Sequence, residues 1–324
     1  MLATIILTHN EERHIARAIR SVQPFCNEVV VVDSGSTDRT VEIARALGAV
    51  VLTNPFVNHA VQFQWALDHA PITSDWIMRL DADEIVEPDL AARIAAELGD
   101  LPADVVGVNL ERKHIFMGRF IRHGGRYPLV LLRIWRRGRG RIEQRWMDEH
   151  IVVSGGRTVT FAGGFADVNL FDLTFFTDKH NKYATREAVD VLNQRYGLFA
   201  TDRALTASSA SVQASFKRGV KERLYNKLPF WMGPLFYFLY RYVIQLGFLD
   251  GREGLIYHVL QGFWYRFLVA AKVVEYDAVL RDLATADERL ARLEQLTGLP
   301  LRRKADASHA PILAMAASET SKLA

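Results

Sequence analysis

Cysteine is almost absent from this sequence, because only Cys26 occurs among its 324 residues. A single thiol excludes a disulfide within the chain and is compatible with a reducing compartment. Glycine is missing at a place where one large class of enzymes needs it. The residues after the first apolar run read THNEER, which excludes the Gly-x-Gly-x-x-Gly turn of dinucleotide-binding oxidoreductases at that point.

Long uninterrupted apolar runs are also lacking. The start, MLATIILTHNEER, has a short apolar run without a basic lead or a cleavage site, so we expect a first strand there and no signal peptide. Residues 228–249 and 254–274 approach membrane-span length, but Arg241 and Arg266 interrupt them near the centre. A charge at mid-bilayer costs about 2.5–3.5 kcal/mol on insertion scales. The pattern therefore favours helices that lie in a membrane interface, with a buried helical subdomain as the alternative.

Acidic residues are scarce in two stretches, although the net charge of the chain is only +3. Residues 112–145 contain eleven lysines and arginines and one acid, and residues 217–272 contain nine against three acids. Such patches suit an anionic partner, such as a nucleotide, a phosphorylated glycan or a lipid headgroup, or they form a solvated surface. No nucleic-acid recognition motif accompanies them, so we expect no nucleic-acid partner.

The first hundred residues show a regular alternation of strand and helix patterns. Apolar runs predict strands over residues 2–8, 28–33, 49–54 and 75–81, and helical spacing predicts helices over residues 11–22, 39–48, 59–70 and 87–99. This order predicts an α/β, Rossmann-like fold with a mainly parallel sheet and helices on both faces. Sheets of this kind bind ligands at the carboxyl ends of their strands.

The later part of the chain changes character. Short strand patterns and glycine-rich turns follow residue 101, and helical spacing returns over about residues 178–196. We expect four segments in all: a catalytic domain over 1–200, a linker over 201–216, an aromatic, membrane-associated helical region over 217–300, and a disordered tail over 301–324.

Polar residues stand at three of the predicted strand ends. They are Thr8, Asn10 and Glu11 after the first strand, Asp33, Gly35 and Asp38 after the second, and Asp81 and Asp83 after the fourth. Since the carboxyl ends of parallel strands meet at one edge, these residues should converge on one crevice. Their polar groups suit hydrogen bonds to a nucleoside. For the second set the alternative is capping of the next helix by Ser36 or Thr37.

The stretch LDADE places two carboxylates on one side of an extended backbone, because Ala82 separates Asp81 from Asp83. Like charges that close together repel, so we expect a cation beside them. Mg²⁺ and Mn²⁺ take oxygen ligands and commonly bridge carboxylates to substrate phosphates. The motif therefore predicts a divalent metal site.

A second acidic group lies in RWMDEHI, where Asp148, Glu149 and His150 follow Trp146. Taken in order, TIILTHNEE, VVVVDSGSTDRT, LDADE and WMDEH resemble glycosyltransferase family 2, inverting enzymes of GT-A fold, over about the first 200 residues. The resemblance implies a nucleotide-diphosphate-sugar donor, a divalent metal ion (Mn²⁺ or Mg²⁺) on the Asp-x-Asp motif, and a single displacement at the anomeric carbon.

Three further stretches, HGGRYP, KHNKYATREA and GFLDGREGL, are similar to bacterial members that build the lipopolysaccharide core, such as the core β-1,4-glucosyltransferases. This likeness implies a donor such as UDP-glucose and a lipid-linked or lipopolysaccharide-core glycan as acceptor. It also implies a peripheral location on the cytoplasmic face of the inner membrane.

The resemblance implies roles for particular residues. The nucleotide-sugar would contact Thr8, Asn10, Glu11, Asp33, Gly35, Asp38, Arg79, Asp81 and Arg126. The metal would be held by Asp83 with Asp81 and His150, the acceptor would rest on Trp146, and the catalytic base would be Asp148 or Glu149. One departure is Gln64-Trp65, where relatives often carry Arg-Asn. The resemblance then implies that a charge contact to the base or diphosphate is either missing or supplied by Arg79 or Arg126.

Two other functions fit parts of the sequence. The aspartate pair resembles that of haloacid-dehalogenase-type phosphatases, although there it follows the first strand and here the fourth. A non-catalytic membrane-binding protein would explain the basic, aromatic C-terminal part, but not the convergent carboxylates. Trp146 fits the core as well as an acceptor pocket, and His180 fits helix packing better than catalysis.

Overall fold

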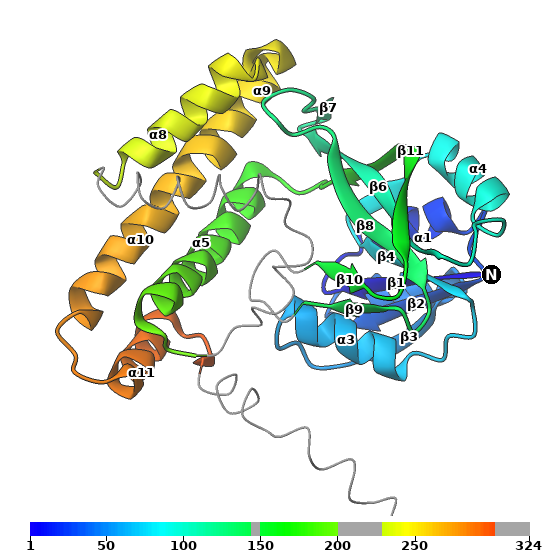
Figure 1. Cartoon of the computed structure of the whole chain (residues 1–324), viewed down its shortest axis with the longest axis horizontal. Helices are drawn as coiled ribbons and strands as arrows, with labels where there is room; N and C mark the ends of the chain where they lie inside the picture. The colour runs from blue at the N-terminus through cyan, green and yellow to red at the C-terminus, as the bar shows by residue number, and fades with distance from the viewer. Residues whose placement is uncertain (144–149, 200–228, 302–324) are drawn as a thin grey trace, which may run out of the picture.

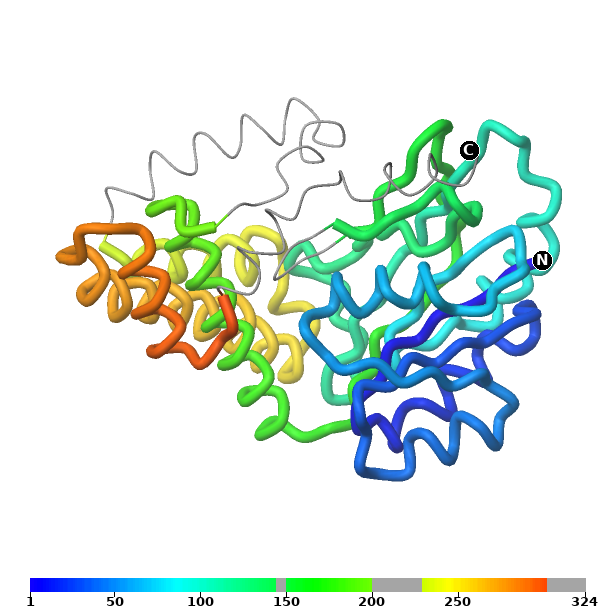
Figure 2. The backbone as a smooth tube through the Cα atoms, turned by 90° about the horizontal axis from the view of Figure 1, so that it is seen from below, coloured from blue at the N-terminus to red at the C-terminus, as the bar shows by residue number. Residues whose placement is uncertain are grey.

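Two layers lie side by side in the computed structural model of the chain (Figure 1). One is a β-sheet covered by helices, built by residues up to Val168, and the other consists of long helices. The view from below separates the same two layers (Figure 2). The structure describes residues 1–143, 150–199 and 229–301. The expected linker over 201–216 and the tail after Leu301 lie outside these residues.

Within the part of the chain that the structure describes, the main sheet has nine strands. Their order is β3-β2-β1-β4-β8-β6-β11-β5, with β7 paired to β6 beside that order, while β9 and β10 form a separate antiparallel pair. The strands are β1 Leu2–Thr8, β2 Glu28–Asp33, β3 Val50–Thr53, β4 Trp76–Asp81, β5 Glu84–Val86, β6 Val105–Phe116, β7 Arg119–Phe120, β8 Leu129–Arg136, β9 Gly140–Ile142, β10 Ile151–Val153 and β11 Arg157–Val168. The four strands predicted from the first hundred residues pair in parallel, which confirms the predicted α/β class.

Four helices accompany the parallel strands where the spacing predicts them. They are α1 Ile15–Val22, α2 Thr40–Ala46, α3 His59–His69 and α4 Pro88–Glu97. Helix α1 begins later than predicted, because residues 11–14 form a turn in which the carbonyl of Glu11 accepts from the N–H groups of His14 and Ile15.

Both faces of the parallel part are buried, which explains why its strands are continuous apolar runs. On β1, Ile6 belongs to the core beneath α1, α2 and α4, whereas Ile5 belongs to the core beneath α3. Strand β2 divides in the same way, with Val31 in the first core and Val30 in the second. Each such side chain contributes roughly 1.5–3 kcal/mol when it is fully buried. The two cores together fix the strand ends at one edge.

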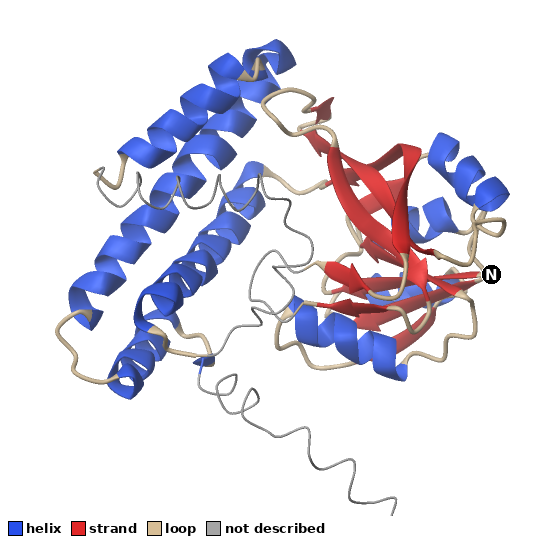
Figure 3. Cartoon of the chain, viewed as in Figure 1, coloured by secondary structure: helices blue, strands red, loops and turns tan. Residues whose placement is uncertain are grey.

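The rest of the sheet curls back toward this edge. Only Ala82 and Asp83 separate β4 from β5 in the chain, yet β8, β6 and β11 lie between them in the sheet. Strands that are close in the chain but far apart in the sheet order require the sheet to curl. In the structure, β6, β8 and β11 rise across the other strands (Figures 1 and 3). Side chains on the inner side of the curl therefore face the turn between β4 and β5.

The helical layer starts with α5 Leu173–Tyr196, which begins five residues before the predicted helix. Asp172 explains this start, because its side chain accepts a hydrogen bond from the N–H of Phe175 at 2.9 Å. Gly197, with φ of 63°, ends the helix. The remaining helical segments are α8 Met232–Leu239, the π-helical turn η1 Tyr240–Ile244, the 3₁₀ turn η2 Gly247–Asp250, α9 Gly251–Tyr257, the π-helical turn η3 His258–Trp264, α10 Tyr265–Leu280 and α11 Ala286–Thr297.

Both arginines that interrupt the apolar runs bind other parts of the protein, but only Arg241 is buried. Arg241 is 4 % exposed, and its Nε donates to the carbonyl of Gly124 at 2.6 Å. Arg266 pairs with Glu187 of α5 at 2.6 Å. Within the described residues, no helix has both the length and the apolar character that a membrane span requires.

Two glycine-rich stretches, far apart in sequence, form a joint between the layers: the loop after β7 and the turns around η2. His123 donates its backbone N–H to Asp250 at 2.8 Å, and its Nδ1 lies 2.7 Å from the other oxygen of that carboxylate. His258 is fully buried where Gly124 and Gly247 leave room for its ring. Burial lowers the pKa of His258 to about 4, so the ring is neutral at pH 7. The HGGRYP and GFLDGREGL stretches thus meet in space.

We predict that Gly124→Ala destabilises the protein more than Gly138→Ala. Both glycines have positive φ, 68° and 76°, so alanine is strained by roughly 1 kcal/mol at either place. A Cβ at position 124 would also overlap the His258 ring, whereas one at position 138 meets no atom within 4 Å. We expect about 2 kcal/mol of additional loss for Gly124→Ala in urea unfolding. Equal losses would mean that the His258 ring yields without cost.

Candidate active site

The loops after β1 and β2 are tied together at the carboxyl edge of the sheet. Thr8 is the register partner of Asp33, and Leu7 is the partner of Asp81, so the three strand ends lie side by side. The backbone N–H of Asn10 donates to Ser36 Oγ at 2.8 Å. The side-chain oxygen of Asn10 accepts a hydrogen bond from the N–H of Thr37 at 2.8 Å. The predicted convergence of these strand ends is therefore present.

Two predicted nucleoside ligands shape the second loop. Asp33 is 3 % exposed, and one carboxylate oxygen accepts from the N–H groups of Gly35 and Ser36, both at 2.9 Å. Asp38 accepts from the N–H of Thr40, the first residue of α2, at 3.0 Å. The N-cap position is Arg39, which makes no side-chain cap hydrogen bond, so neither Ser36 nor Thr37 is the N-cap. Burial opposes ionisation of Asp38, but the hydrogen bonds from Thr40 lower its pKa. Contact of either carboxylate with a nucleoside stays a prediction.

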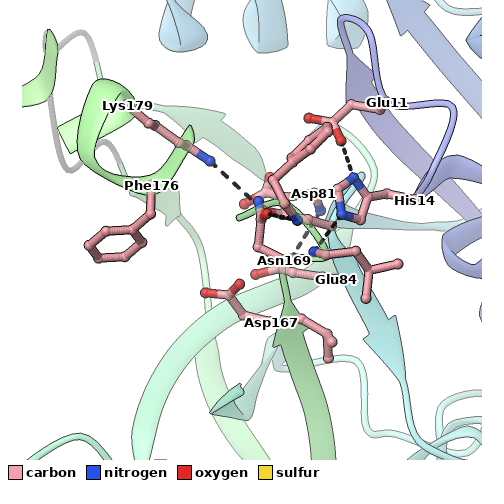
Figure 4. Close-up of polar contacts among 12 residues, drawn as sticks. Glu11, His14, Asp81, Glu84, Asp167, Asn169, Phe176 and Lys179 are labelled. Atoms are coloured by element: carbon pink, nitrogen blue, oxygen red, sulfur yellow. Dashed lines mark hydrogen bonds and ion pairs between the residues drawn. The ribbon is translucent and has the colours of Figure 1, made fainter. Parts of the chain in front are cut away.

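The first loop leaves one group without a partner. Thr8 is 4 % exposed, and its Oγ1 has no hydrogen-bond partner among the described residues. A buried hydroxyl of this kind costs free energy unless a ligand or water satisfies it. Glu11, by contrast, contacts Nδ1 of His14, whose Nε2 accepts from the N–H of Leu170 at 2.9 Å (Figure 4). The Glu11 carboxylate thus orients a buried histidine.

Arginines contact two of the three acids in the turn between β4 and β5. One oxygen of Asp81 lies 3.2 Å from Nε of Arg79, and the other lies 3.4 Å from a guanidinium nitrogen of Arg133. Glu84 is 1 % exposed and lies 2.6 Å from the same Arg133 nitrogen. Its second oxygen accepts from the N–H of Asp81 at 3.0 Å. The expected cation beside the acids is therefore present in the protein itself.

The pKa values of Asp81 and Glu84 shift in opposite directions. Burial raises the pKa of Glu84 to about 8 against the charge of Arg133, and the neighbouring Asp81 adds to the rise. Burial also disfavours ionised Asp81, but the charges of Arg79 and Arg133 hold its pKa well below the ordinary value. Asp81 is accordingly the permanent anion of the pair.

Strands β6 and β11 extend the same network across the curl. Asp167 of β11 lies opposite Glu84 of β5 in the register. Its carboxylate is 3.1 Å from Arg112 and 3.0 Å from Nδ1 of His114, both on β6. Arg112 also reaches Glu84 at 3.6 Å. Although burial works in the other direction, His114 and Arg112 lower the pKa of Asp167.

Asp83, the predicted metal ligand, is contacted by the segment that enters the helical layer. Its Oδ2 accepts from the side-chain amide of Asn169 at 3.1 Å and lies 3.8 Å from Nζ of Lys179. Its backbone carbonyl accepts from Arg17 and from the N–H of Val168. Sequence reasoning missed Asn169 and Lys179. Asn169 directly follows the end of a strand, and this position could have indicated a site residue. No sequence pattern near Lys179 indicates that it lies opposite Asp83.

The remaining predicted ligands lie elsewhere or outside the described residues. Arg126 stacks over Tyr257 at 5.4 Å, at the joint between the layers. His150 is exposed, and its Nδ1 lies 3.3 Å from Glu143. Its role as a metal ligand stays a prediction, as does the role of Arg126. Trp146, Asp148 and Glu149 lie outside the described residues.

The acids that are present fit a metal ion shared with a substrate, and not one held by protein alone. Among the described residues, no group of three His, Cys, Asp or Glu side chains could enclose an ion. Asp83 nevertheless keeps an 18 % exposed carboxylate, which no arginine pairs within the described residues. Mg²⁺ and Mn²⁺ sites of phosphate-handling enzymes often use one or two carboxylates and complete the shell with substrate phosphates and water. Asp83, with Asp81 beside it, meets that requirement.

Comparison with known proteins identifies the family. The family model described as Glycosyl transferase family 2 matches residues 4–166, which is half of the 324-residue chain. The chain belongs to glycosyltransferase family 2. This membership confirms the family predicted from the four motifs and favours a transferase over the phosphatase and scaffold alternatives.

Individual relatives match the glycosyltransferase over different lengths. The lipopolysaccharide core biosynthesis glycosyltransferase LpsC of Rhizobium meliloti is 27 % identical over 284 residues, 86 % of this chain and 93 % of the relative. An uncharacterized glycosyltransferase of Rickettsia typhi is 43 % identical over 93 residues, so the match spans 29 % of this chain and only 31 % of that relative. The solved glucosyl-3-phosphoglycerate synthase of Mycobacterium tuberculosis shares 25 % identity over 35 % of this chain and 44 % of its own, with a TM-score of 0.30.

We predict that Arg133→Met destabilises the protein by about 3 kcal/mol, because it removes the shared counter-charge of Glu84 and Asp81. The loss should grow as pH rises through about 8, the pKa of Glu84, since the protonated acid needs no cation. Urea unfolding at several pH values measures both effects.

The double variant Arg133→Met with Glu84→Gln provides the control. A neutral amide at position 84 should recover part of the lost stability and remove the added pH dependence. A double variant that is no more stable than Arg133→Met at high pH would contradict the role given to this network.

Proposed function

We propose that the protein transfers a sugar from a nucleotide diphosphate, UDP-glucose or a similar donor, to a lipid-linked or lipopolysaccharide-core glycan, with inversion at the anomeric carbon. The acidic turn carries this proposal. It leaves Asp83 partly exposed at the edge where β1, β2 and β4 end, while arginines contact Asp81 and Glu84. Membership of glycosyltransferase family 2 and the similarity to LpsC over most of both chains support it.

The donor would lie across the tied loops after β1 and β2. The buried hydroxyl of Thr8 and the neighbouring strand end of Asp33 suit the nucleoside, and ionised Asp81 suits the ribose hydroxyls. Arg79 stacks on Phe63 at 5.5 Å and contacts Asp81, so it supplies the positive charge that Gln64-Trp65 lacks. These contacts explain binding and orientation, which are separate from the chemical step.

The chemical step needs two things from the chain. A divalent ion held by Asp83 and Asp81 would supply positive charge to the departing diphosphate. Asn169 keeps the Asp83 carboxylate oriented through the hydrogen bond at Oδ2. The acceptor hydroxyl must lose a proton, and Asp148 or Glu149 takes it in this proposal, with Trp146 supporting the acceptor. A positioned carboxylate of this kind contributes roughly 10²–10⁴ in rate.

We predict that three substitutions separate binding from chemistry. Asp83→Asn should lose Mn²⁺-dependent donor binding, as wild type does in excess chelator, because Asp83 is the acid of the turn that no arginine pairs within the described residues. Of Asp148→Asn and Glu149→Gln, the one that removes the base should lower turnover about 10²–10⁴-fold with donor affinity nearly unchanged. Calorimetry of a panel of nucleotide-sugars, followed by transfer assays, measures both quantities.

Asp282→Asn is the matched control, since Asp282 is a strongly exposed acid of the helical layer. It should behave as wild type in both assays. Full activity of Asp83→Asn, or of wild type in chelator, would refute the metal. Near-normal turnover in both Asp148→Asn and Glu149→Gln would refute the assignment of the base.

A membrane surface would bring the acceptor to this site. An apolar face runs along α8, η1 and η2, with exposed Trp231, Phe236, Leu239, Tyr240, Val243, Ile244, Leu246, Phe248 and Leu249. Isolated apolar residues are common on surfaces, but a continuous face of this size is typical of an interaction site. Because Arg241 points inward, no charge interrupts it there. We propose that this face rests on the cytoplasmic side of the inner membrane, aided by the lysines and arginines of residues 217–227, which lie outside the described residues.

We predict that Val243→Glu with Ile244→Glu abolishes binding to anionic vesicles. Both side chains are exposed, at 49 % and 69 %, so carboxylates should leave the fold intact but repel the lipid surface. Leu296→Glu, on α11 and 37 % exposed, is the matched control and should bind as wild type. Co-sedimentation with neutral and anionic vesicles at low salt is the measurement. Equal binding of wild type to both vesicles, or to neither, would leave this region a helical subdomain only.

A further inference from the structure

Lys179 is the least constrained cation of the charge cluster around the acidic turn. Arg79 and Arg133 lie within 3.4 Å of their carboxylates and are 11 % and 5 % exposed. Lys179 is 35 % exposed and stands 3.8 Å from Asp83. Its ammonium lies 5.9 Å from the ring centres of both Phe175 and Tyr183, one turn before and after it on α5. It is held near Asp83 without being locked to it.

The chemistry of Asp83 makes this position important. Lysine is ordinarily protonated at physiological pH, and the ammonium of Lys179 stands 3.8 Å from the Asp83 carboxylate. An ammonium and a divalent ion at the same carboxylate compete for the same negative charge. Yet the same ammonium favours a diphosphate, because lysine binds phosphate as a mobile point charge on a flexible stem.

We propose that Lys179 neutralises Asp83 while no donor is bound, and turns to the donor diphosphate once that carboxylate holds a divalent ion. The inference rests on the proposed function and adds a specific residue to it. It assigns α5 a part in donor binding, although this helix otherwise packs against α10 and α11 in the helical layer. The lysine would keep the acidic turn stable when empty and prevent an unbound ion from occupying it strongly.

The proposal predicts that one substitution, Lys179→Met, raises the affinity for Mn²⁺ and lowers the affinity for pyrophosphate. Lys179→Met keeps the apolar stem and removes the charge. Mn²⁺ alone should then bind about tenfold more tightly, because its competitor at Asp83 is gone. Inorganic pyrophosphate in saturating Mn²⁺ should bind about tenfold more weakly, because its cation is gone. Electron paramagnetic resonance of free Mn²⁺ measures the first affinity, and calorimetry measures the second. Pyrophosphate avoids any assumption about the nucleoside.

Two variants serve as controls. Lys182→Met, an exposed lysine three residues along the same helix, should leave both affinities unchanged. Lys179→Arg keeps the charge and should leave both nearer to wild type than Lys179→Met does. Any pattern in Lys179→Met other than tighter Mn²⁺ and weaker pyrophosphate, including loss of both, overturns the inference.

Failure of the inference is distinguishable from failure of the proposed function. If wild type binds a nucleotide-sugar only with Mn²⁺, but Lys179→Met shows no opposed shifts, the donor proposal stands and the role of Lys179 falls. If wild type binds neither Mn²⁺ nor pyrophosphate, both proposals are overturned. Circular dichroism of each variant confirms that the comparison is made between folded proteins.

Discussion

One guanidinium, that of Arg133, joins Asp81 at the end of β4 to Glu84 at the start of β5. Two residues separate β4 from β5 in the chain, whereas three other strands lie between them in the sheet. The contacts of Arg133 with both strands therefore join the two ends of the curl. Removing water from two acids and an arginine is costly, and such a group is stable only when every charge is paired. Arg79, on β4 itself, and Arg112, on β6, complete the pairing. The geometry of the acidic turn is thus inseparable from that of the whole sheet.

This constraint explains why the candidate site spans both halves of the chain. The turn faces the inner side of the curl, where β11 ends and the chain passes to α5. Asn169 and Lys179, which contact Asp83, therefore belong to the segment that enters the helical layer. The N-terminal α/β half contains the acidic motif, but it does not by itself supply the groups that orient or neutralise its exposed carboxylate.

The sequence predicts local features of this fold well and non-local ones poorly. Strand β1 was predicted to the residue, and α3 and α4 nearly so, because apolar periodicity reports directly on burial. Convergence of Thr8, Asp33 and Asp81 followed from parallel pairing alone. The role of Arg133 could not be foreseen, because β8 enters between β4 and β6 from a distant part of the chain, and one arginine in a basic stretch resembles the next. The start of α5 was missed because its cap, Asp172, precedes the apolar pattern.

The same reasoning connects the helical layer to the proposed chemistry. Among the described residues, the layer contacts the sheet at the joint of His123 with Asp250, at the segment around Asn169 that contacts the acidic turn, and in an apolar cluster of Phe116 with Phe176 and Tyr257. Helix α5 follows the segment around Asn169; its first turns face Asp83, and its last turns pack on α10 and α11. A membrane resting on the apolar face of α8 and η1 would consequently stand at a fixed distance and angle from the donor edge. More than one attachment restricts rotation between the layers, which the proposed function requires in order to present a lipid-borne hydroxyl to a single carbon of the donor sugar.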